Sequence, residues 1–91
     1  MRVPLGERVR HRVEDLPRVR RLTIAGGSCA TAHAVAAAWQ KQFEASPTAR
    51  LPRTVRGFRF RQLRPNQAQT YRLRGTRGAT TVRFDYMVPN G

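Results

Sequence analysis

Arginine is the residue whose number and spacing in this chain suggest chemistry. Residues 50–91 contain ten arginines, and many of them alternate with apolar or aromatic residues. In a β-strand, alternate side chains point to opposite faces of the sheet. One face of such a sheet would then present five guanidinium groups, those of Arg59, Arg61, Arg72, Arg74 and Arg83. Because guanidinium binds phosphate and carboxylate in a bidentate geometry, we expect this face to bind an anionic partner.

The net charge points to the same kind of partner. The 91 residues include 18 basic and 5 acidic side chains, for a net charge of +13 and a pI of 12.0. Arginines directly opposed across strands destabilise a sheet by about 0.2–1 kcal/mol per pair, and a bound polyanion would relieve that repulsion. The sequence therefore predicts a non-enzymatic binding module for a polyanion, with nucleic acid as the leading candidate.

The aromatic residues of the same strands fall on the other side. The alternation directs Phe58, Phe60, Tyr71, Phe84 and Tyr86 toward the core. Proteins that hold single-stranded nucleic acid stack its bases on exposed aromatic rings. We therefore expect contacts with the nucleic-acid backbone and not with stacked bases.

Two other motifs have residue types that suit chemistry. Cys29 and His33 lie one helical turn apart, as metal ligands or a thiolate pair would. His11 is the only other histidine, so we expect an inert, buried cysteine and neither metal nor cofactor. Residues 25–28 (Ala-Gly-Gly-Ser) lie between a strand and a helix, where backbone N–H groups bind phosphate. They lack the lysine of a P-loop, and a turn with a serine cap accounts for them.

A helix is predicted over residues 29–45. Ser28 is a good N-cap, and Ser46-Pro47 ends the pattern. Seven alanines give this segment high helix propensity. Its apolar stripe consists of Ala32, Val35, Trp39 and Phe43.

Strands are predicted over residues 19–24, 54–63, 69–74 and 79–88, with turns at 65–67 and 75–78. We therefore predict an α+β fold in which one Ala-rich helix packs on a three- to four-stranded antiparallel sheet, in the order β-α-β-β-β. The predicted contact between helix and sheet consists of Val35, Trp39, Phe43, Phe58, Phe60, Leu73, Val82 and Phe84.

The chain divides into a basic N-terminal arm, residues 1–18, and a single domain, residues 19–91. The arm fits a helical face or an alternating edge strand, and its Arg8, Arg10 and Arg12 are added to the predicted binding surface. One cysteine cannot form an internal disulfide, and no apolar run is long enough to span a bilayer. The N-terminus lacks a signal-peptide pattern, so we expect a cytoplasmic protein or one from which a leader was removed.

Residues 22–86 resemble small exported domains of actinobacteria whose function is largely uncharacterised. The resemblance lies in residues 28–32 (Ser-Cys-Ala-Thr-Ala), 35–36 (Val-Ala), 56–60 (Arg-Gly-Phe-Arg-Phe), 71–73 (Tyr-Arg-Leu) and 82–84 (Val-Arg-Phe). In that pattern the positions of Phe60 and Leu73 are commonly cysteine, so packing would replace a cross-strand disulfide here. An alternative function is that of an exported or virion-associated module, in which the same face binds an acidic protein, an anionic wall polymer or a larger assembly.

A basic chain of this size that ends in a sheet with Tyr71-Arg72-Leu73-Arg74 is also similar to RelE-like ribonuclease toxins. That resemblance implies a third function, RNA cleavage. Arg61, Arg72 or Arg83 would then stabilise the cleaved phosphate, and Tyr71 or His33 would transfer protons. The two-helix hairpin and the glycine-aspartate-tyrosine-arginine signature of those toxins have no counterpart here.

Overall fold

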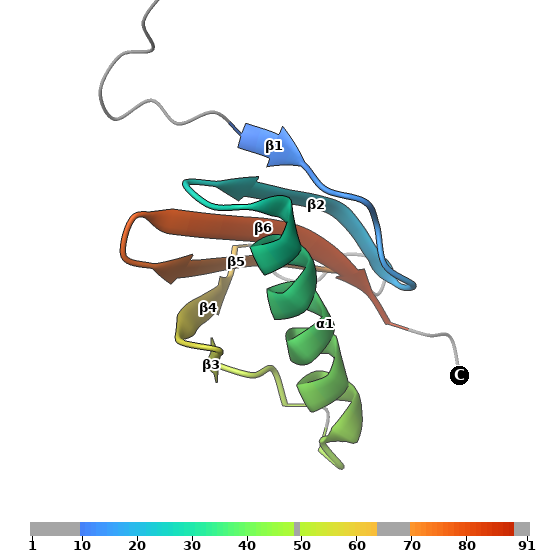
Figure 1. The fold of residues 1–91 in the computed structure, drawn as a ribbon. Helices are drawn as coiled ribbons and strands as arrows, with labels where there is room; N and C mark the ends of the chain where they lie inside the picture. The colour runs from blue at the N-terminus through green and yellow to red at the C-terminus, as the bar shows by residue number, and fades with distance from the viewer. Residues whose placement is uncertain (1–9, 49, 64–69, 89–91) are drawn as a thin grey trace, which may run out of the picture.

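The computed structural model describes residues 10–48, 50–63 and 70–88. They form one helix and a six-stranded antiparallel sheet in the strand order β1-β2-β6-β5-β4-β3 (Figure 1). Strand β2, from the first half of the chain, pairs inside the sheet with β6, the last described strand. The elements are β1 (Arg10–Arg12), β2 (Val19–Ala25), α1 (Cys29–Ala45), β3 (Thr54–Val55), β4 (Phe58–Gln62), β5 (Thr70–Arg77) and β6 (Thr80–Met87).

The α+β class is confirmed, but the predicted three to four strands and the order β-α-β-β-β are wrong. One additional strand is β1, which pairs with residues 23–25 of β2 at the edge of the sheet and lies within the predicted arm. The other comes from a turn inside the predicted strand 54–63. Arg56 and Gly57 both have positive φ, 51° and 82°, and form a two-residue loop between β3 and β4. Two such residues define a type I′ hairpin.

The predicted turn at 75–78 is also misplaced. Gly75 lies inside β5, opposite Phe60 and Val82, and the strand continues to Arg77. The loop consists of Gly78 and Ala79 only, and Gly78 has a φ of 58°. A positive φ at the first loop position matches the glycine of a type II′ hairpin. The predicted turn at 65–67 lies outside the described residues.

The helix has the predicted bounds. The Ser28 side chain accepts a hydrogen bond of 3.1 Å from the Thr31 backbone N–H, which satisfies a free donor of the first turn. The whole predicted stripe is buried, and Ala36 is buried beside it. The expectation of a buried Cys29 is wrong, because this residue is exposed. The buried stripe begins only at Ala32, so the first helical residue lies outside the core.

Helix α1 lies across one face of the sheet (Figure 1). Trp39 is the centre of this layer, with its ring centroid 5.2 Å from Phe43, 5.2 Å from Tyr86 and 5.3 Å from Phe84. All eight residues of the predicted contact between helix and sheet are buried. The core also includes Val13, Val19, Leu22, Ile24 and Tyr86, from β2 and the segments beside it, and Val55 from β3 at the far edge of the sheet.

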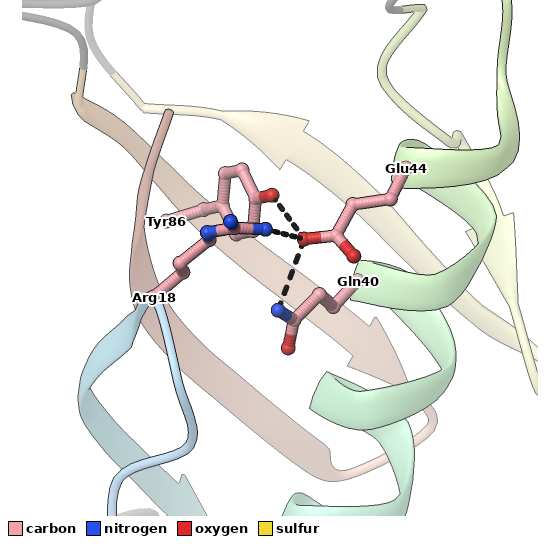
Figure 2. Close-up of polar contacts among 4 residues, drawn as sticks. All are labelled: Arg18, Gln40, Glu44 and Tyr86. Carbon is pink, nitrogen blue, oxygen red and sulfur yellow. Dashed lines mark hydrogen bonds and ion pairs between the residues drawn. The ribbon is translucent and has the colours of Figure 1, made fainter. Parts of the chain in front are cut away.

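A polar contact fixes the C-terminal half of the helix to the sheet (Figure 2). Oε2 of Glu44 accepts hydrogen bonds from the Tyr86 hydroxyl at 2.6 Å, from Arg18 at 2.9 Å and from Gln40 at 3.1 Å. Arg18 lies in the turn between β1 and β2, and Tyr86 lies in β6. One carboxylate therefore connects the helix to two separate parts of the sheet.

Candidate nucleic-acid interface

The pairing of the strands gathers the predicted arginines on one side of the sheet. Arg61 is opposite Arg74, and Arg74 is opposite Arg83. The same line continues through Thr23 to Arg12. Paired residues project to the same face, and this is the face opposite the buried Phe60, Leu73 and Phe84. We call it the arginine face and define it by Arg12, Arg20, Arg21, Arg59, Arg61, Arg72, Arg74 and Arg83.

The arginine face is broad and not a single line. Neighbouring strands are about 4.8 Å apart, so the line from Arg12 to Arg61 crosses about 19 Å. Arg59 lies two residues further along β4 and pairs with Thr76. On the other side of the line, Arg72 pairs with Asp85. Residues two positions apart on one strand are about 7 Å apart, so the three rows together cover about 14 Å along the strands.

A bulge in β2 places two adjacent arginines on this face. The pairing of β2 with β6 shifts by one residue between Arg20 and Thr23. Arg20 and Arg21 are both exposed, whereas Val19 and Leu22 on either side are fully buried. Arg21 has a φ of 57°, in the left-handed region. The sequence prediction included neither arginine, because it built the binding surface from the three later strands and the N-terminal arm alone. Two polar residues between two apolar ones were the available signal.

Asp85 is the carboxylate within this group of arginines. Its Oδ1 accepts a hydrogen bond of 3.1 Å from Nε of Arg72, and its Oδ2 lies 3.7 Å from a terminal nitrogen of Arg21. The Asp85 side chain is only 13% exposed, whereas that of Arg21 is 67% exposed. Arg74, in the central line, has a buried Nε that forms no hydrogen bond with the described residues. Asp85 therefore offsets part of the positive charge of Arg21 and Arg72.

The bulge borders two hollows in the arginine face. One has a volume of about 330 Å³ and the other about 360 Å³, and both are lined by Arg12, Arg21 and Asp85. A larger hollow, of about 830 Å³, lies beside β4 and the C-terminal end of α1, and Arg61 is the residue of the arginine face that reaches it. The first hollow is lined by four arginines, namely Arg12, Arg21, Arg72 and Arg83.

Two predicted binding residues of the N-terminal arm remain, Arg10 and Arg8. The backbone of Arg10, in β1, pairs with that of Ala25, in β2. Arg8 lies outside the described residues. Of the three arginines predicted in the arm, Arg12 is thus part of the arginine face.

His33 and Tyr71, the residues named for proton transfer in RNA cleavage, do not lie on the arginine face. His33 is exposed on α1, across the sheet from the arginine face. Tyr71 is on the core side of β5, where its ring contacts Phe43 edge-on at 6.0 Å. Among residues 10–48, 50–63 and 70–88, no three His, Cys, Asp or Glu residues form a group that suits a metal ion. The same residues contain no helix with the length and hydropathy needed to cross a bilayer.

Comparison with known proteins adds no assignment. No family model matches the chain, and no match is found among the curated proteins or the solved structures.

Proposed function

We propose that this protein is a non-enzymatic nucleic-acid-binding module that uses its arginine face. The observation on which the proposal rests is the line of directly paired arginines, Arg61, Arg74 and Arg83, on a sheet face that no described element covers. In the free protein these neighbours repel one another. Phosphate groups would replace that repulsion with charge-assisted hydrogen bonds.

The chemistry of the face favours the backbone of the nucleic acid over its bases. Its described side chains are mainly arginine and threonine, and the aromatic rings of β4, β5 and β6 are turned toward α1. Bases that are splayed out on this surface would find no ring to stack on. Phosphate contacts depend on charge and not on sequence, so we expect binding without strong sequence preference.

The test is a salt titration of binding with matched charge variants. We expect wild-type protein to bind a fluorescent DNA or RNA duplex with an affinity that falls steeply between about 50 and 200 mM salt. The binding variant changes Arg59, Arg61, Arg72 and Arg74 to Gln and should lose binding. The control variant changes Lys41, Arg50, Arg53 and Arg56 to Gln. It removes the same charge from outside the face and should retain most of the affinity.

Three results would contradict the proposal. Salt-independent binding would remove its electrostatic basis. Equal loss in the two fourfold variants would show that net charge alone matters. Binding to an acidic protein or to an anionic wall polymer, without binding to either duplex, would favour the exported-module alternative. Circular dichroism of each variant ensures that loss of binding is not loss of fold.

A further inference from the structure

We infer that the bulge in β2 forms a phosphate-binding hollow in which Arg21 is a direct contact. This inference rests on the proposed function and adds a specific site to it. The ligand is a phosphodiester group of the bound nucleic acid. The hollow of about 330 Å³ is surrounded by the four arginines Arg12, Arg21, Arg72 and Arg83.

The backbone of Arg21 provides the first argument. A φ of 57° is unfavourable for residues with a Cβ, whereas glycine adopts it readily. Glycine at this position would therefore adopt the same backbone conformation at a lower steric cost. The Arg21 side chain is 67% exposed and does not pack in the core, so it adds little to stability. Strained residues with exposed, charged side chains are typical of binding sites.

The position of Asp85 provides the second argument. Asp85 lies between Arg72 and Arg21, and all three residues line the same hollow. A guanidinium group has five N–H donors in a rigid plane. Arg72 uses its Nε for Asp85, and the distance of 3.7 Å from Arg21 to Asp85 is longer than a hydrogen bond. Donors therefore remain on both residues for the oxygens of a phosphate.

The other arginines with positive φ show the contrast. Arg18, at 67°, lies in the turn between β1 and β2 and binds Glu44, so its side chain has a structural partner. Arg56, at 51°, lies in the hairpin between β3 and β4, at the far edge of the sheet from the bulge. Arg56 thus shares the backbone conformation of Arg21 without its position. It provides a matched control.

The experiment compares Arg21→Gly with Arg56→Gly. Each variant loses one charge and gains glycine at a left-handed position, so we expect a melting temperature at or above that of the wild type for both. Arg21→Gly should weaken binding to a short DNA duplex by about tenfold and reduce the slope of log affinity against log salt by about 1. Arg56→Gly should change affinity by less than about twofold. Arg21→Asn, which also tolerates a positive φ, is the second variant.

The outcomes separate this inference from the proposed function. Equal losses of affinity in Arg21→Gly and Arg56→Gly would overturn the phosphate hollow, while the fourfold variants still test the arginine face. If Arg21→Asn bound as tightly as the wild type, the hollow would again be excluded. If the wild-type protein showed no salt-dependent binding to the duplex, the proposed function itself would fail.

Discussion

The ring of Phe60 lies directly against Gly75 in the neighbouring strand. A Cβ placed on Gly75 would come within 2.6 Å of two carbon atoms of that ring. The two residues are directly paired between β4 and β5. Glycine is needed here for space, and the aromatic ring covers the backbone that a side chain would otherwise cover.

Replacement of Gly75 by alanine should therefore destabilise the protein. Because the added methyl group overlaps a buried ring, we expect a loss of about 1–3 kcal/mol in the free energy of unfolding, measured with urea. Phe60→Leu provides space for the methyl group. The double variant should therefore lose less stability than the two single losses added together. If the losses of the two single variants simply added in the double variant, the Phe60 ring would not be what excludes a side chain at Gly75.

The Tyr86 hydroxyl should make stability depend on alkaline pH. Burial, with the hydrogen bond to Glu44 as a second cause, raises the pKa of Tyr86 from 10.0 to about 12. The unfolded chain then loses this proton before the folded protein does, so stability is complete below pH 10 and falls between pH 10 and 12. The loss should be on the order of 2 kcal/mol, measured by chemical unfolding. In Tyr86→Phe this loss should disappear, and an unchanged alkaline decline would contradict the assignment.

Glu44 should produce the opposite dependence in acid. Hydrogen bonds from Tyr86 and Gln40, together with Arg18, lower the pKa of Glu44 below its usual 4.5. Its contribution is therefore present above pH 4.5 and is lost as the pH falls through the lower folded value. We expect Glu44→Gln to be less stable than the wild type near neutral pH and to lose less stability on acidification. Glu14→Gln, which removes an exposed carboxylate outside this contact, is the control variant.

Asp85→Asn should separate stability from binding. The carboxylate offsets repulsion around Arg21 and Arg72 in the free protein, so its loss should lower the melting temperature. The same change removes a negative charge from the hollow, so the affinity for duplex DNA should rise severalfold. Thermal unfolding with and without DNA measures both effects. A variant that is less stable and also binds more weakly would assign Asp85 a positioning role in the bound state.

The helix and the strand phase could be predicted because local patterns determine them. Ser28, the apolar stripe and Ser46-Pro47 define α1 without tertiary information. Alternation likewise places Arg59 and Arg61 opposite Phe58 and Phe60. Each of these signals lies within a few residues of the structure that it specifies.

The missed features depend on residues in conformations that their type disfavours. Arg56 and Arg21 adopt positive φ, which is uncommon for arginine, so neither the hairpin nor the bulge was expected. In the hairpin, Gly57 follows Arg56 and was the available turn signal. Gly75, by contrast, was predicted to lie in a turn but is inside β5. It suggested a turn, but its role is to make room for a ring from another strand.

The pairing of β2 with β6 has a consequence for how the chain folds. Val19 and Tyr86, which pair there, come from opposite ends of the described chain. The hairpins from β3 to β6 need only local contacts, whereas the pair β1 and β2 joins these strands only through β6. Such non-local closure slows folding. During translation, the apolar side of α1 therefore cannot pack on the complete sheet until β6 has left the ribosome.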